Sequence, residues 1–169
     1  MEEYTIRPAV AGDCEEILRL RQEMSVYNRN PSLQMTADRL RKDGFGEWKW
    51  FECIVVEDKK MRAQDQTFLW GYALYFYIYT TSIGRTIFLE DIFLSEQYRG
   101  SGVGSKLFSQ VAQIGLAQDC QILKWEVYNW NTASIEFYKK RGAYDVTETT
   151  DLNVYQMNRL ELEQLAKSH

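Results

Sequence analysis

Histidine is almost absent from this sequence, since His169 is the only one among 169 residues. A side chain at a terminus that frays does not readily anchor a catalytic dyad or a metal site. We therefore exclude histidine-assisted serine and cysteine hydrolases and most zinc enzymes. Any acid–base chemistry is expected to come from Glu, Asp, Tyr, Cys or Lys side chains.

Cysteine is also scarce, and Cys14, Cys53 and Cys120 are widely spaced without a Cys-x-x-Cys pair. This pattern predicts neither a disulfide framework nor a zinc site. The chain lacks a charged-then-apolar leader and a long uncharged apolar span, which predicts a cytoplasmic protein without membrane contact. A net charge of −4 and a pI near 5.2 argue against nucleic acid as the main partner and favour a cationic substrate.

The length and apolar content of the chain fit one domain. Its 169 residues, 45% of them hydrophobic, are enough for one sizeable core and too few for two. The sequence contains no repeats, linkers or low-complexity segments. We therefore expect a single domain over residues 1–169.

The order of apolar and turn residues predicts alternating strands and helices. Strands are expected over residues 4–8, 51–57, 67–80, 86–94, 122–128, 143–147 and 153–157. The three strands between residues 51 and 94 are expected to form an antiparallel meander, with a hairpin loop over 58–66 and a bulge at Gly71. Helices are expected from Asp13 to about Tyr27, from Thr36 to just before Asp43, over 102–117, and from Thr132 to about Arg141. Asp13 would form a capping box with Glu16, and a short polar tail would end the chain.

Residues 86–104 are the most informative stretch, because a strand, a glycine turn and a helix follow one another without a gap. The strand is apolar apart from Glu90 and Asp91, and such charges are costly to bury without a purpose. Glycines at alternate positions from Gly100 to Gly104 then remove the β-carbons that would keep a ligand from the amides of a helix N-terminus. The stretch therefore predicts an anion-binding cradle.

Two other phosphate-binding patterns and a purely structural turn compete with this interpretation. A Walker-type loop requires Gly-Lys-Ser/Thr, but Lys106 lies between Ser105 and Leu107. The dinucleotide fingerprint would have Ser105 at its third glycine position, and no βαβ series follows it. A glycine turn that only joins strand to helix is the structural alternative, and the residues downstream favour a function over it.

The segment Gln97-Tyr-Arg-Gly-Ser-Gly-Val-Gly104 resembles the Q/R-x-x-G-x-G/A signature of GNAT-type N-acetyltransferases, whose loop amides hold the pyrophosphate of acetyl-coenzyme A. Within that family, several motifs in the same order resemble the spermidine/spermine acetyltransferases and their thialysine acetyltransferase relatives. These motifs are Ile6-Arg-Pro-Ala9, Asp43-Gly-Phe-Gly-Glu47, Leu89-Glu-Asp91, Tyr98-Arg-Gly100, Trp130-Asn131 and Phe137-Tyr-Lys-Lys-Arg-Gly-Ala143.

The resemblance implies an α/β GNAT fold, in which helices flank a central mixed, mostly antiparallel sheet whose strands are splayed at the coenzyme site. It implies acetyl-CoA as cosubstrate, no metal, a small-molecule amine as acceptor and a homodimer. The reaction needs a base, because an alkylamine with a pKa of about 10.4 is mostly ammonium at neutral pH. Glu90 is the candidate base, directly or through a water, since burial would raise its pKa. A structural pair with a Lys or Arg is its alternative role.

The resemblance also assigns the donor site. Tyr138 matches the general acid that protonates the coenzyme A thiolate, whereas without the resemblance it would be a helix tyrosine packed on the sheet. Backbone groups of Ile92, Phe93 and Leu94 would bind the pantetheine arm, and Asn131 and Ser134 match positions near the coenzyme. The pyrophosphate would contact Gly100, Ser101, Gly102, Val103, Gly104 and Ser105. Arg99 is either a phosphate contact or a solvated arginine at a turn.

The resemblance implies an acceptor site of Tyr27, Asn28, Glu90, Asp91 and Glu126, in which the carboxylates would hold ammonium groups. Here the chain departs from the polyamine enzymes, since Asn28 replaces an acidic residue and Thr149-Thr-Asp-Leu152 replaces an acidic-Gly-Trp run. We therefore expect a small primary amine, either a diamine or polyamine or a thialysine-like acceptor, with Glu126 as substitute charge. The alternatives are a protein lysine or N-terminal acetyltransferase and a non-catalytic acetyl-CoA sensor or interaction module.

Overall fold

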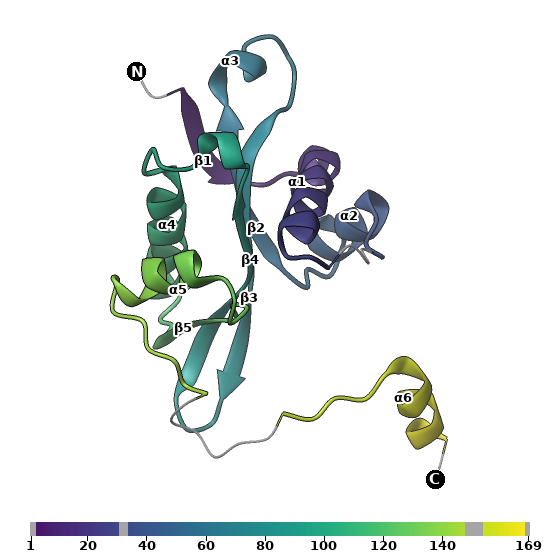
Figure 1. Ribbon diagram of the computed structural model, residues 1–169. Coiled ribbons are helices and arrows are strands. Elements are labelled where there is room, and N and C mark those ends of the chain that lie inside the picture. Colours follow the sequence, from purple (N-terminus) through teal and green to yellow (C-terminus); the bar gives the residue numbers. More distant parts are fainter. Residues whose placement is uncertain (1–2, 31–33, 148–153, 168–169) are drawn as a thin grey trace. The chain divides into compact units, whose positions relative to one another are not determined.

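The computed structural model describes residues 3–30, 34–147 and 154–167 (Figure 1). The chain forms two compact units, Met1–Tyr128 and Asn129–His169. Among the described residues, the strands all belong to the first unit. The second unit contains helices α5 (Thr132–Lys139) and α6 (Arg159–Ala166).

The first unit is built around one sheet with the strand order β1-β2-β3-β4-β5. The strands are β1 (Tyr4–Pro8), β2 (Glu52–Asp58), β3 (Leu69–Thr80), β4 (Gly84–Leu94) and β5 (Ile122–Trp125). Neighbouring strands are antiparallel except β4 and β5, which run parallel. Most residues of β3 are aromatic or aliphatic, types that pack well on a pleated surface. The predicted meander and the mixed, mostly antiparallel sheet are confirmed.

Helices cover both faces of this sheet (Figure 1). The short 3-10 helix η1 (Ala11–Asp13) leads into α1 (Cys14–Tyr27), which lies on one face with α2 (Ala37–Phe45), while α4 (Val103–Ala117) lies on the other. The apolar side chains of α1 recur at helical spacing and pack against the sheet. The main core on this face contains Cys14, Ile17, Leu20, Met24, Leu40, Cys53, Val55, Leu69, Tyr72, Leu74 and Phe93. These contacts fix α1 beside β3 and β4.

A bulge interrupts the pairing of β2 with β3 next to Gly71. The register shifts between Val56 and Glu57 and leaves Trp70 without a partner in the ladder. A β-carbon at Gly71 would lie 2.4 Å from the carbonyl oxygen of Phe93 on β4, so this close approach of backbones requires glycine. The predicted bulge is confirmed.

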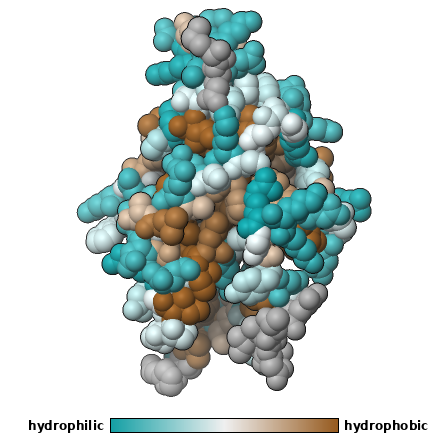
Figure 2. Space-filling view, turned by 90° about the vertical axis from the view of Figure 1, so that its left-hand side faces the viewer, coloured by the Kyte–Doolittle hydropathy of each residue, from teal (hydrophilic) through white to brown (hydrophobic). Residues whose placement is uncertain are grey.

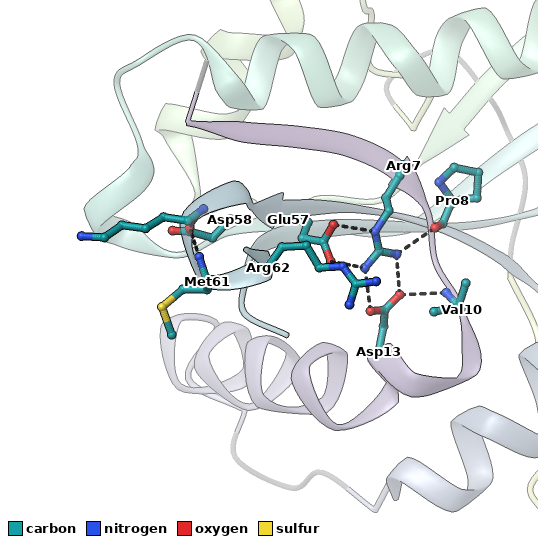
Figure 3. A network of polar contacts seen from close by, with 9 residues as sticks. Arg7, Pro8, Val10, Asp13, Glu57, Asp58, Met61 and Arg62 are labelled. Carbon is teal, nitrogen blue, oxygen red and sulfur yellow. Dashed lines mark hydrogen bonds and ion pairs between the residues drawn. The ribbon is translucent and has the colours of Figure 1, made fainter. Parts of the chain in front are cut away.

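Arg7 on β1 bridges two buried carboxylates (Figure 3). Its guanidinium donates to Asp13 over 2.8 and 2.9 Å and to Glu57 on β2 over 2.7 and 3.0 Å. Asp13 is only 1% exposed and Glu57 4%. Asp13 also accepts a hydrogen bond from the Val10 N–H over 2.8 Å and makes no capping bond to α1. The predicted capping box with Glu16 is therefore wrong, because Asp13 is committed to Arg7.

The ends of two elements also differ from the prediction. Thr36 caps α2 by accepting a hydrogen bond from the Arg39 N–H over 3.2 Å, as predicted. The helix nevertheless continues to Phe45, because Gly44 is buried against the Phe51 ring rather than ending the helix. The strand expected over 122–128 ends at Trp125.

The predicted final pair of strands is wrong for the described residues. Residues 143–147 and 154–157 are not strands, while Asn153 lies outside the described residues. Helix α6 occupies part of the expected polar tail. Strand-forming residues need a neighbouring strand to pair with, and neither segment pairs with another among the described residues.

Apolar side chains are exposed at the far end of the β3–β4 hairpin, including Tyr77, Tyr79 and Ile83. Apolar patches are also visible among polar surface on the side of the molecule where α4 lies (Figure 2). None of the helices in the described part of the chain is both long enough and apolar enough to cross a membrane.

Candidate active site

Glu90 lies at a second bulge, this time in β4. In the β3–β4 ladder Leu74 lies opposite Asp91, while Tyr75 lies opposite Leu89, so Glu90 has no partner in the ladder. A bulge bends its strand and re-aims a side chain. Glu90 is accordingly released from the regular alternation of β4, and it is exposed.

Asp91, the neighbouring carboxylate, is paired. Its Oδ2 accepts a hydrogen bond from the Tyr72 hydroxyl over 2.9 Å and lies 3.3 Å from Nε of Arg21 on α1. Burial raises the pKa of Asp91, while Arg21 and the Tyr72 hydrogen bond lower it. An ion pair with a Lys or Arg was the alternative role predicted for Glu90. In the structure, Asp91 makes this pair with Arg21.

Within residues 3–30, 34–147 and 154–167, Glu90 makes no hydrogen bond or ion pair. The surrounding protein still removes part of its solvent, and this burial raises its pKa. The negative charges of Asp91 and Glu126 raise the pKa of Glu90 further, and Arg21 lowers it. The predicted direction of the shift is confirmed. Three predicted acceptor-binding carboxylates, here called the acidic cluster (Glu90, Asp91 and Glu126), therefore interact electrostatically.

Tyr27 and Asn28 lie at the C-terminal end of α1, and Arg99 connects this end to the segment after β4. The Arg99 guanidinium lies 4.8 Å from the centre of the Tyr27 ring and 5.2 Å from that of Phe93. Its Nε donates to the Leu94 carbonyl over 2.9 Å. Both rings attract the cation, so Arg99 joins two parts of the predicted site.

The last part of β4 extends beyond its pairing with β5. The parallel ladder ends at Leu89 and Trp125, whereas pairing with β3 continues to the end of β4. From Glu90 onward, the edge of β4 toward β5 therefore lies outside that ladder. The predicted pantetheine contacts, Ile92, Phe93 and Leu94, all lie in this part of β4. The splaying of the two strands stays a prediction.

After β4, the 3-10 helix η2 (Glu96–Tyr98) leads into the glycine turn. Gly100 and Gly102 have φ angles of 80° and 85°, which glycine adopts without steric cost. β-carbons built at Gly100, Gly102 and Gly104 would meet nothing within 4 Å, so the turn is open on its outer side. The first turn of α4 contains no acidic side chain that would offset the partial positive charge of the helix N-terminus.

Aromatic packing supports this turn from the sheet. The Trp70 and Tyr98 rings stack with centres 4.2 Å apart and planes at 4°. Trp70 Nε1 donates to Asp58 over 2.8 Å, and Asp58 also caps the short helix α3 (Lys59–Arg62), where the sequence predicts a loop. The Ser101 hydroxyl donates to the Tyr98 carbonyl over 3.0 Å. The bulge between β2 and β3 thus presents the tryptophan that supports the turn.

In the second unit, Asn131, Ser134 and Tyr138 lie on α5 or at its start. The Asn131 side chain accepts a hydrogen bond from the Ser134 N–H over 3.3 Å, so this pair caps the helix. Burial raises the pKa of Tyr138 to about 12, so its hydroxyl is protonated at neutral pH. Gly142, with φ of 89°, follows the helix end as predicted. The roles of these residues toward a coenzyme stay predictions.

Residues 17–143 match the acetyltransferase (GNAT) family. The match includes the acidic strand, the glycine turn and α5. The chain belongs to the GNAT acetyltransferase family. The resemblance drawn from the sequence motifs is therefore confirmed, and the protein is an enzyme of this family.

This GNAT enzyme is similar to a thialysine N-epsilon-acetyltransferase of Sus scrofa, with 36% identity over 98% of this chain and 99% of the relative. It is 34% identical to spermidine/spermine N(1)-acetyltransferase-like protein 1 of Homo sapiens, over 98% of this chain and 24% of that protein. An aminoglycoside N-acetyltransferase in complex with CoA shares the fold, with a TM-score of 0.67, 18% identity, and coverage of 92% of this chain and 95% of that one. The predicted relationship to the thialysine and spermidine/spermine groups is confirmed.

Arg21 and Trp70 contact residues in or next to the predicted site, and the sequence did not indicate either of them. Arg21 directly follows the buried Leu20 on α1, which is the only local sign that it lies near the sheet. Trp70 adjoins the predicted bulge at Gly71, but its stacking on Tyr98 joins positions distant in sequence. Contacts of this kind depend on strand register, which local patterns do not define.

Proposed function

We propose that this enzyme transfers the acetyl group of acetyl-CoA to the primary amine of a small molecule, a diamine, polyamine or thialysine-like acceptor. The observation that carries the proposal is the environment of Glu90. Its pKa is raised by burial and by two further carboxylates, and a bulge frees it from the ladder. Such a cluster attracts an ammonium group, and a carboxylate with a raised pKa is a better proton acceptor.

In the proposed reaction, Glu90 takes a proton from the bound ammonium, directly or through a water. The amine nitrogen then attacks the carbonyl carbon of the thioester, a C–N bond forms, and the C–S bond breaks. The nitrogen then loses its second proton to solvent, and Tyr138 gives a proton to the departing coenzyme A thiolate. Tyr138 later regains a proton from solvent, and Glu90 releases the one that it took. The products are the amide, the free thiol and one proton. A pKa of about 12 keeps Tyr138 protonated until that step.

The proposed donor site uses the open glycine turn. The backbone amides of residues 100–105 would bind the pyrophosphate, because α4 begins there and no side chain obstructs the glycines. Backbone groups of residues 92–94 would bind the pantetheine arm, with Asn131 and Ser134 near the coenzyme. Since the family match extends from residue 17 to residue 143, we propose that both units belong to one catalytic domain. A cytoplasmic homodimer stays a prediction. Light scattering measures the molar mass in solution and so tests whether the protein is a dimer.

Acetyl-CoA-dependent thiol release tests the proposed function. The panel contains spermidine, spermine, diaminopropane, thialysine, lysine, an arylalkylamine and a basic peptide. We expect release with a small amine. Release with the peptide alone would favour a protein acetyltransferase. No release with any acceptor, while calorimetry still detects coenzyme A binding, would contradict acetyl transfer and favour the sensor.

Tyr138→Phe tests the proposed acid. The substitution removes the hydroxyl proton and keeps the ring, so we expect kcat to fall about 10²- to 10⁴-fold. Coenzyme A affinity, measured by calorimetry, should be unchanged. An unchanged kcat would exclude Tyr138 as the obligatory acid.

Gly104→Val tests the proposed phosphate contact without backbone strain, because Gly104 is not among the glycines with positive φ. We expect coenzyme A affinity to fall about tenfold or more, because the new side chain occupies the side of the turn where phosphate would lie. Gly12→Val is the matched control, since a β-carbon there also meets nothing within 4 Å. Equal coenzyme A affinity in the two variants would show that the turn is only structural.

A further inference from the structure

Arg21 brings a positive charge to the acidic cluster. Its Nε lies 3.3 Å from Asp91 Oδ2, and 33% of its side chain is exposed. Burial raises the pKa of both Glu90 and Asp91, and the charge of Arg21 lowers it in each case. Arg21 therefore lies close enough to act on the cluster and still reaches solvent.

The terminal nitrogens of the Arg21 guanidinium donate no hydrogen bond to the described part of the chain. Within the described ranges 3–30, 34–147 and 154–167, Arg21 makes no hydrogen bond, and its ion pair with Asp91 is formed through Nε at 3.3 Å. The Asp91 oxygen that it approaches already accepts the Tyr72 hydroxyl. The terminal N–H groups of Arg21 are therefore available to a ligand, and a guanidinium binds a carboxylate through two parallel hydrogen bonds.

Arg7 is an example of an arginine whose guanidinium is fully used to neutralise carboxylates of the protein. Its Nε and both terminal nitrogens donate to Asp13 and Glu57, and four hydrogen bonds result. Arg21 makes no comparable set of bonds to Asp91. A purely structural role thus leaves the exposed part of its guanidinium unexplained.

We propose that Arg21 binds a carboxylate of the acceptor, so that the enzyme prefers basic amino acids to diamines of the same length. The acidic cluster would attract the reacting ammonium, and Arg21 would attract the α-carboxylate at the other end. A diamine instead presents a second cation, which Arg21 repels. This inference rests on the proposed acetyl transfer and assigns Arg21 as a specificity-determining residue.

The test compares acceptors that differ only by the α-carboxylate. Lysine is matched with 1,5-diaminopentane, and ornithine with 1,4-diaminobutane. We expect kcat/KM to be higher for the amino acid of each pair. Arg21→Gln should lower the ratio of amino acid to diamine about tenfold or more, mainly through the KM of the amino acid. The ratio for Arg21→Lys should lie between those of the wild type and Arg21→Gln, because lysine keeps the charge and loses the planar fork of the guanidinium.

Arg39→Gln is the matched control, because Arg39 is an exposed helical arginine whose pair with Asp43 lies on α2. In this control, the ratio of kcat/KM for the amino acid to kcat/KM for the diamine should equal that of the wild type. Arg21→Gln also changes the pKa of Glu90, but that change acts equally on both members of a pair and cancels in the ratio. An equal loss for both members, or a wild type that prefers diamines, would overturn the assignment of Arg21 and leave acetyl transfer standing.

Calorimetry keeps the two proposals separable if no acceptor is acetylated. Lysine and 1,5-diaminopentane are titrated into the wild type and into Arg21→Gln without acetyl-CoA. Lysine should bind the wild type about tenfold more tightly than the variant, while 1,5-diaminopentane should bind the variant at least as well. Equal lysine affinity in both proteins would overturn the Arg21 assignment.

Discussion

The Arg7 network at the β1–β2 edge and the acidic cluster beside β4 both place carboxylates near an arginine, but they pair them differently. Arg7 donates to both Asp13 and Glu57, and this lowers the pKa of Glu57. In the acidic cluster Arg21 approaches one oxygen of Asp91, and the pKa of Glu90 is raised, chiefly by burial. The comparison separates carboxylates that hold the fold together from Glu90, which remains available to a ligand.

The difference follows from the cost of taking charge out of water. A buried carboxylate needs a counter-charge and satisfied hydrogen bonds, and removing its partner leaves that cost uncompensated. Glu90 escapes much of the cost because its side chain still reaches solvent, although the surrounding protein removes enough of that solvent to raise its pKa. It keeps a raised pKa, which suits a base.

Arg7→Leu should have the largest effect on stability. It leaves Asp13 and Glu57 buried without their counter-charge, so we expect a loss of about 3–5 kcal/mol in the free energy of unfolding. Urea unfolding measures it. Arg39→Leu, in a pair where the arginine is 65% exposed, should cost less than about 1 kcal/mol. Equal losses in both variants would remove the distinction between the buried and exposed pairs.

Glu90→Gln should have the largest effect on turnover and little on stability. The amide cannot accept the amine proton, so kcat/KM should fall about 10²- to 10⁴-fold. The free energy of unfolding should stay within about 0.5 kcal/mol, because no partner is lost. A strong destabilisation without a kinetic defect would place Glu90 with the structural carboxylates.

The pKa shifts of the two regions are opposite, so their losses as pH falls should occur on different sides of the ordinary glutamate value. Glu57 has a lowered pKa in the folded protein, so its contribution to stability is present above the ordinary value of 4.5 and is lost as pH falls through the folded pKa. Glu90 has a raised pKa, so activity should rise as pH increases through a value above 4.5. Urea unfolding of wild type and Glu57→Gln at several acidic pH values measures the contribution of Glu57 to stability. A pH profile of kcat/KM measures the titration of Glu90. A kcat/KM profile that is flat above 4.5 would contradict the raised pKa.

Glu126→Gln should have the smallest effect. It removes one of the negative charges that raise the pKa of Glu90, so the acidic limb of the kcat/KM profile should move to lower pH. The free energy of unfolding should change by no more than about 0.5 kcal/mol, because Glu126 is exposed. An unmoved limb would mean that Glu126 does not contribute to the cluster.

The strands of the meander and the glycine turn were predictable because local residue types determine them. β4 with its Glu90-Asp91 pair and the start of α4 near Gly102 are both found as the sequence predicts. The bulge at Glu90 was not predictable, since it exists only in the register of β4 with β3. Asp13 was expected as a helix cap, although Arg7, which pairs with Glu57 of the neighbouring strand β2, also binds Asp13 and outcompetes that role.

The close approach at Gly71 places an evolutionary restriction on a position with no proposed chemical role. A methyl group there would lie 2.4 Å from the Phe93 carbonyl oxygen, whereas one at Gly12 would meet nothing within 4 Å. Lineages that descend from this sequence could vary at position 12 while position 71 stays fixed. Invariance at position 71 would then record how closely two strands approach, and it would say nothing about catalysis.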